Sequence, residues 1–182
     1  MTAAERETLL KNLADSRERL LGTVSGLTFE QLHYRPAPER WTVAECVEHI
    51  TTVEGRVLGL IQKTLSDGPT PAKRSVMEDR TLVKDVAGRI TRFQAPEFLA
   101  PRGQWPDEQL LKEFEAVRQR TQEFAGSTES DLRKHFYAHP VFGDLDLYQW
   151  LLLISAHCER HRAQSEEVMA SAGFPRSSAA AS

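Results

Sequence analysis

A chain of 182 residues has the usual length of one domain, and 40% hydrophobic with 27% charged residues is typical of a globular protein rather than a disordered one. The net charge is −3, with 23 basic and 26 acidic residues spread along the chain, so we expect binding neither to nucleic acid nor to a membrane surface. No apolar run reaches the roughly 20 residues of a membrane span, and the first residues lack a signal-peptide pattern. We therefore expect a cytoplasmic protein, with Cys46 and Cys158 as reduced, partly buried thiols.

The first half of the chain predicts two long helices. In residues 3 to 24, apolar residues recur at helical spacing among charged ones. One further helical turn is expected at residues 28 to 32, before prolines at 36 and 38 disfavour helix. The second long helix begins after Thr42, which with Glu45 forms a capping-box pattern, and its apolar stripe continues until the glycine- and proline-rich residues 66 to 71.

The second half predicts two more long helices after an extended connection. Residues 67 to 105 are interrupted by prolines and glycines, and only Thr81 to Phe93 has a helical pattern. A third long helix is expected from Pro106 to Gly126, then a loop from His135 to Gly143, and a fourth helix from about Asp146 to Ser171. Four long helices with almost no strand pattern predict an all-α four-helix bundle, and the long connection allows a crossover between the second and third helices.

The last expected helix carries polar side chains where its core-facing stripe should be apolar. The stripe recurs every three or four residues and consists of Leu147, Trp150, Ile154, His157, His161, Gln164 and Val168. Three consecutive polar positions in a core are costly unless the side chains have partners. His157 and His161 lie one turn apart on the same face, so their imidazoles can converge on one metal ion. Histidines at this spacing also occur as hydrogen-bonded core or surface residues, so the pair alone leaves both interpretations open.

A third histidine on another helix favours the metal interpretation. His49 lies on the second helix at one edge of its apolar stripe. Three neutral imidazoles leave a fourth position for water or substrate, as in catalytic rather than structural zinc sites. The segment between His157 and His161 lacks the HExxH order, because Glu159 stands at the third place. A glutamate base of the metalloprotease kind is therefore not expected.

Three segments in this order and spacing resemble the DinB-like superfamily: residues 34 to 49, 139 to 143 and 149 to 164. Residues 92 to 101 are also similar to a loop of that family. The resemblance implies an up-down-down-up bundle, which we expect as a single domain over residues 1 to 174. The composition of residues 175 to 182 predicts a disordered tail. The resemblance also implies one divalent transition-metal ion, zinc or nickel, held by His49, His157 and His161, and frequent homodimers. The family includes enzymes that depend on a low-molecular-weight thiol, such as mycothiol-dependent maleylpyruvate isomerase and bacillithiol S-transferases.

Two polar residues are candidates to orient the expected ligands. Glu45 lies one turn before His49, although its capping-box role explains it equally well. Gln164 follows His161 in the stripe and could hydrogen-bond a ligand or a bound water. Of the remaining residues, we expect Trp41 to be a core anchor, His33 to be structural, His135 and His139 to lie at helix ends, at the surface or along the site, and Arg160 and Arg162 to face solvent.

The sequence leaves two classes of function open. In the first, the chain is a metal-dependent transferase or hydrolase, with a thiol as a candidate cofactor and a small molecule as substrate. In the second, it is a non-catalytic metal-binding or interaction module in which the ion mainly fixes the helices. The sequence shows no general base beside the expected ligands, so the catalytic residues are unknown.

Overall fold

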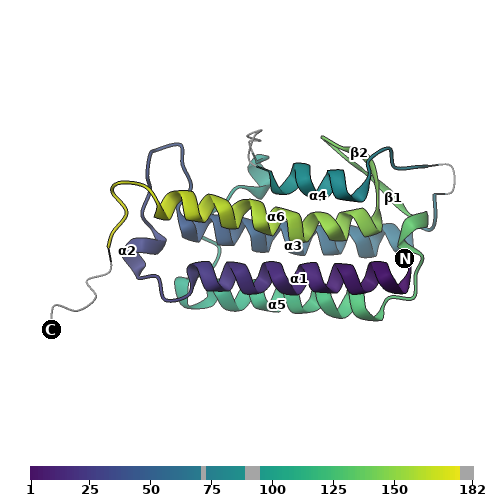
Figure 1. The fold of residues 1–182 in the computed structure, drawn as a ribbon, viewed down its shortest axis with the longest axis horizontal. Coiled ribbons are helices and arrows are strands. Elements are labelled where there is room, and N and C mark those ends of the chain that lie inside the picture. Colours follow the sequence, from purple (N-terminus) through teal and green to yellow (C-terminus); the bar gives the residue numbers. More distant parts are fainter. Residues whose placement is uncertain (71–72, 89–94, 177–182) are drawn as a thin grey trace.

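The computed structural model describes residues 1–70, 73–88 and 95–176. Its long helices pack side by side (Figure 1). The long helices are α1 (Ala3–Val24), α3 (Val43–Ser66), α5 (Asp107–Ser127) and α6 (Leu147–Met169). The shorter elements are α2 (Phe29–Leu32), α4 (Asp79–Ala87), the 3-10 turns η1 (Glu97–Leu99) and η2 (Leu132–Lys134), and the strands β1 (Phe136–His139) and β2 (Gly143–Asp146). The predicted all-α four-helix bundle is confirmed.

Local capping groups explain where the helices begin. At the start of α3, the Thr42 hydroxyl accepts the backbone N–H of Glu45, and the Glu45 carboxylate accepts the N–H of Thr42. Asp146 and Gln149 form the same reciprocal pair at the start of α6. Each capping box satisfies backbone donors that have no partner inside the helix. These local pairs fix the ends of the two helices that carry the three histidines.

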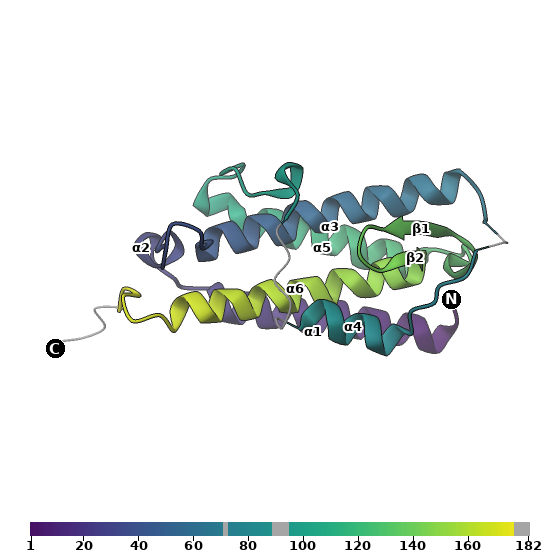
Figure 2. The same ribbon diagram turned by 90° about the horizontal axis from the view of Figure 1, so that it is seen from above.

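The chain direction is up-down-down-up. In Figures 1 and 2, α3 and α5 run side by side in one direction, while α1 and α6 run in the other. The 24 residues of α3 rise about 36 Å, so the connection to α5 must return over that length. On the way, α4 packs against α6 outside the four-helix bundle. Of the expected helical segment 81 to 93, residues 89 to 93 lie outside the described residues.

The prediction of a loop from His135 to Gly143 is wrong, because these residues form most of a β-hairpin. Strands β1 and β2 pair antiparallel, with Phe136 opposite Asp146 and His139 opposite Gly143. Gly143 has a φ of 70°, which favours glycine at the turn. The hairpin is tied to α6 by Trp150, whose indole N–H donates to a strand carbonyl, that of Tyr137, at 3.1 Å. Strands of four residues are too short to show an alternating pattern.

The core has two apolar clusters. One includes Leu13, Ile61 and Leu151, and the other includes Val47 and Phe114. Along two of the helices a buried polar side chain lies between the clusters: Ser16 on α1 and Arg118 on α5.

Both cysteines are buried thiols that form no disulfide with each other. Burial raises the pKa of Cys158 to about 11, so its thiol is neutral. Among the described residues, no helix is both long and apolar enough to cross a membrane. Of the tail expected at residues 175–182, Pro175 is tied down, because its carbonyl accepts a hydrogen bond from Gln31 at 2.9 Å. Residues 177–182 lie outside the described part of the chain.

Candidate metal centre

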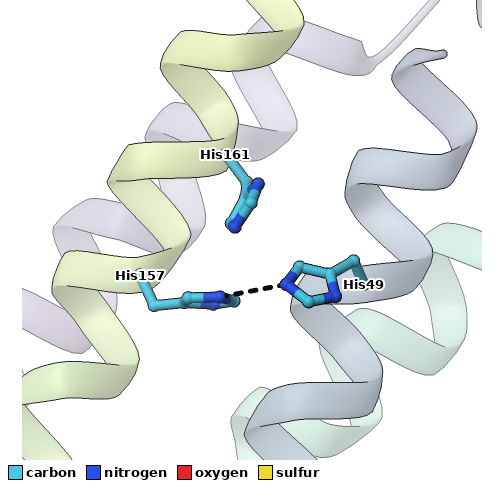
Figure 3. A group of neighbouring side chains, drawn as sticks. All are labelled: His49, His157 and His161. Carbon is cyan, nitrogen blue, oxygen red and sulfur yellow. Dashed lines mark hydrogen bonds between the residues drawn. The ribbon is translucent and has the colours of Figure 1, made fainter. Parts of the chain in front are cut away.

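Three histidines from two helices converge in the seam between α3 and α6. Figure 3 shows His157 and His161 projecting from α6 toward His49 on α3. One ring nitrogen from each lies within 4.8 Å of the others, and the Nε2 atoms of His49 and His157 are 3.2 Å apart. In a tetrahedral site with zinc–nitrogen distances of 2.0–2.1 Å, two nitrogens stand about 3.4 Å apart. The donor set therefore fits one small divalent ion after minor side-chain adjustment.

Hydrogen bonds orient two of the three rings. The Nδ1 of His49 lies 2.8 Å from the carbonyl oxygen of Leu99, which can only accept, so Nδ1 carries the proton. The Nδ1 of His161 lies 3.0 Å from Oε1 of Gln164, which is also an acceptor. In both rings, the neutral form then has its lone pair on Nε2. This is the arrangement of a metal-binding histidine whose other ring nitrogen is held by a carbonyl oxygen.

The surroundings favour neutral histidines. His49 and His161 are buried and His157 is half-buried. Burial lowers the pKa of His49, and burial together with the nearby His161 and His49 rings lowers the pKa of His157 well below 6.5. Neutral imidazoles keep a lone pair free to bind a metal.

The Nε2 atoms of His49 and His157 lie in direct contact. Because Nδ1 of His49 is protonated, its Nε2 presents a lone pair to the Nε2 of His157 at 3.2 Å. Two lone pairs at this distance repel each other unless a proton or a cation lies between them. A proton on His157 Nε2 satisfies this contact as a hydrogen bond, and a metal ion bound by both nitrogens would take the place of that proton.

The two orienting candidates have different surroundings. Gln164 contacts the candidate ligand His161, as described above. The Glu45 carboxylate accepts from the backbone N–H of Thr42 at 2.8 Å and from the Arg35 guanidinium at 2.6 Å. The group that holds Nδ1 of His49 is the Leu99 carbonyl. The capping-box role accounts for Glu45.

Trp41 was expected in the core but lies against the histidines. Its ring centroid is 4.7 Å from that of His49 and 5.7 Å from that of His161, on which it stacks with an interplanar angle of 27°. Its side chain remains partly exposed. Trp41 thus forms an aromatic wall of the site. Its position directly before the cap of α3, two helical turns before His49, is the sequence signal that could have placed it there.

The expectation that Arg160 faces solvent is wrong. Arg160 is buried, and its guanidinium donates to the carbonyls of Gly88 and Val86 at the end of α4. The expectation failed because α4 covers a face of α6 that a simple four-helix bundle would leave open. Arg162 is only partly exposed and pairs with Glu159 and Glu166 on its own helix.

The other three histidines lie outside the cluster, and of these His139 is close enough to contribute to the lowered pKa of His157. His33 pairs with Asp107 at 2.9 Å, and Nδ1 of His135 lies 3.0 Å from the carbonyl oxygen of Asp131. His139 packs its ring 5.2 Å from that of Trp150, and its Nδ1 accepts backbone N–H groups at the hairpin turn. Burial lowers the pKa of His139 to about 4.

The fold and the site together define a class of protein. Its members are bundles of four long helices with a crossover connection, in which three histidines converge between two of the helices. A model of the DinB superfamily matches residues 12–165, and the chain therefore belongs to the DinB superfamily. This confirms the resemblance inferred from the sequence segments.

Two individual proteins are similar to this chain. It is 25% identical over 156 residues to YuaE, an uncharacterized protein of Bacillus subtilis strain 168, with 85% of this chain and 93% of YuaE covered. Among solved structures, YfiT from Bacillus subtilis matches with a TM-score of 0.64 at 18% identity, covering 93% of this chain and 88% of YfiT. YfiT is described as a probable metal-dependent hydrolase with an unusual four-helix bundle topology. At this identity, the match shows a shared fold.

Proposed function

We propose that this chain is a metal-dependent enzyme in which His49, His157 and His161 hold one divalent ion, zinc or nickel. The observation that carries the proposal is the 3.2 Å approach of two ring nitrogens in a buried seam, one of which has its lone pair turned toward the other. A site with three neutral nitrogen ligands and an open fourth position is typical of catalytic zinc. The description of YfiT as a probable metal-dependent hydrolase supports the same class.

The side chains around the ligands have distinct roles in this proposal. Leu99 and Gln164 orient two of the rings, and Trp41 forms an aromatic wall beside the open position. A divalent ion held there would supply Lewis-acid polarisation and lower the pKa of a coordinating water or thiol. The reaction is then attack of water or of a small thiol on an electrophilic substrate, which makes the protein a hydrolase or a thiol transferase.

The metal site is tested first. Elemental analysis of purified protein should give about one divalent ion per chain, and alanine substitution of each of the three histidines should remove most of it. His33→Ala is the matched control, because His33 pairs with Asp107 outside the cluster and should leave metal content unchanged. Full metal content in all three ligand variants would overturn the proposal.

The reaction class is tested with cobalt-substituted protein. Turnover of activated esters without thiol indicates a hydrolase, whereas turnover of an electrophile only with mycothiol, bacillithiol or cysteine indicates a transferase. In the transferase case, thiol addition should also change the visible cobalt spectrum. A bound ion with no turnover in either assay would reject the enzyme proposal and leave a non-catalytic metal-binding module.

We further propose that the protein forms homodimers in the cytoplasm, as the family resemblance implies. Light scattering coupled to gel filtration would give twice the 20.6 kDa chain mass if the homodimer is present.

A further inference from the structure

Glu48 is a buried carboxylate one residue before His49. Its side chain is 6% exposed, and it faces the segment that follows η1. Three successive backbone N–H groups donate to it: Arg102 to Oε1 at 2.7 Å, Gly103 to Oε2 at 2.9 Å and Gln104 to Oε1 at 3.2 Å. Gly103 has a φ of 69°, and a backbone that turns in this way can direct consecutive N–H groups toward one anion.

The same segment provides the partner of the neighbouring histidine. The Leu99 carbonyl, at the end of η1, lies three residues before the backbone groups that Glu48 binds and accepts from Nδ1 of His49 at 2.8 Å. Residues 99 to 104 are therefore attached to α3 at two adjacent side chains, one through a carboxylate and one through an imidazole. The carboxylate bonds hold the segment in place, and the carbonyl fixes the proton of the ring.

We infer that Glu48 is a positioning residue of the metal centre, an inference that rests on the proposed function. By holding residues 102–104, Glu48 keeps the Leu99 carbonyl against His49, which places the proton on Nδ1 and the lone pair on Nε2. Loss of this arrangement leaves His49 free to adopt the other tautomer, which presents an N–H to the metal position. Groups that orient metal-binding histidines in this way typically change metal affinity 10- to 100-fold when they are removed.

A carboxylate suits this position better than an amide of the same shape. Three N–H donors face the side chain, and an ionised carboxylate has two oxygens that only accept. In Glu48→Gln, the NH₂ group would face backbone donors, so at least one buried N–H would lose its partner. The substitution keeps the size of the side chain but weakens the hydrogen bonds that hold residues 102–104 against α3.

The test uses two variants that disturb the hydrogen bonds between Glu48 and residues 102–104, one at the acceptor and one at the donors. Glu48→Gln removes the acceptor, whereas Gly103→Ala leaves the carboxylate intact and disfavours the positive φ that presents the N–H groups. A Cβ at position 103 would meet no atom within 4 Å, so only the backbone conformation is disturbed. Glu5→Gln is the control, because Glu5 also accepts a backbone N–H but has Thr2 and Arg133 as partners.

Two measurements are made on each protein. Histidine ¹⁵N chemical shifts of the metal-free protein report which nitrogen of His49 is protonated, and zinc titration gives the dissociation constant. We expect the wild type and Glu5→Gln to show the Nδ1–H tautomer with the same zinc affinity. We expect Glu48→Gln and Gly103→Ala to lose the single tautomer and to bind zinc at least about ten-fold more weakly.

The outcomes distinguish the positioning role of Glu48 from the metal site itself. If wild-type protein binds no metal, the proposed function fails, while the tautomer measurement still tests Glu48. If wild-type protein binds zinc and both segment variants keep its affinity and tautomer, the positioning role is overturned and the metal site stands. Weaker zinc binding with an unchanged His49 tautomer would also overturn the inference, because the proposed route runs through His49.

Discussion

Arg118 of α5 and Glu54 of α3 form a two-pronged ion pair in the interior of the bundle. The guanidinium Nε lies 2.8 Å from Oε1 and Nη2 lies 2.9 Å from Oε2, and both side chains are almost fully buried. The remaining nitrogen, Nη1, donates to the Leu13 carbonyl at 2.6 Å and to the Ser16 hydroxyl at 2.8 Å. One guanidinium therefore connects three of the four long helices, and every side-chain nitrogen has a partner.

Removal of one member of this pair should destabilise the fold strongly. Arg118→Met leaves the Glu54 carboxylate buried without its counter-ion, and we expect a loss of about 3–5 kcal/mol in the free energy of unfolding. The measurement is urea denaturation followed by circular dichroism. In the double variant with Glu54→Leu, no buried charge remains unpaired, so most of the loss should be recovered.

The matched control is the Arg17–Glu115 pair, which joins α1 and α5 at the surface. Arg17→Met should cost no more than about 1 kcal/mol, as is usual for exposed pairs. Equal losses in Arg118→Met and Arg17→Met would contradict the importance assigned to the buried pair.

Metal should stabilise the native protein without being required for folding. A ligand that binds only the folded state adds about 2.7 kcal/mol at a free concentration 100 times its dissociation constant. Thermal melts should thus shift upward with zinc and downward with a chelator, while the chelated protein keeps its helical circular dichroism because the two apolar clusters remain. His161→Ala should remove the shift. Complete unfolding on chelation would show instead that the ion is structural.

Trp41 should report metal binding by fluorescence. Its ring lies within 6 Å of the His49 and His161 rings, centroid to centroid, so a paramagnetic ion at those ligands would quench its emission. Titration with cobalt should lower the emission to a plateau at one equivalent, and Trp41→Phe should remove most of that change. If the quenching survives in Trp41→Phe, the emission change arises at another tryptophan and the assignment is wrong.

His139 of the β-hairpin should lower the free energy of unfolding as the pH falls. The pKa of His139 in the folded protein is about 4, below its ordinary value of 6.5, so the unfolded chain takes up a proton first as the pH falls. Its contribution to stability is present above pH 6.5 and is lost progressively toward pH 4. The variant His139→Asn keeps an acceptor for the turn N–H groups and removes the titration. With chelator present, the free energy of unfolding of the wild type minus that of the variant should fall from pH 7 to pH 4. A difference that does not change with pH would refute this role.

Much of the fold was predictable because its signals are local. The capping groups of α3, Thr42 and Glu45, are three residues apart, and the helix begins where they indicate. The two histidines of α6 share a face because they are four residues apart, and the structure brings His49 to them. Short sequence spacing accounts for the capping pair and for the shared face of the α6 histidines, whereas the approach of His49 depends on the packing of α3 against α6.

Other features depend on contacts between distant segments and could not be predicted in this way. The partners of Glu48 lie 54 to 56 residues further along the chain, so its charge beside an apolar stripe gave no indication of what it binds. The four-helix pattern predicts that Arg160 faces solvent, whereas α4 is a further helix that packs against α6 and covers that face. The strands were missed because a hairpin of four-residue strands has too few positions to show alternation.

The separation of the histidines along the chain sets the order of events during synthesis. His49 and His157 are 108 residues apart, on the second and the last of the four long helices. A growing chain on the ribosome would expose His49 long before either partner exists, and a single imidazole cannot form the proposed site. The ion would therefore be acquired only after α6 has been made and packed against α3. A product truncated before α6 would retain three of the four long helices, and one of the three ligands.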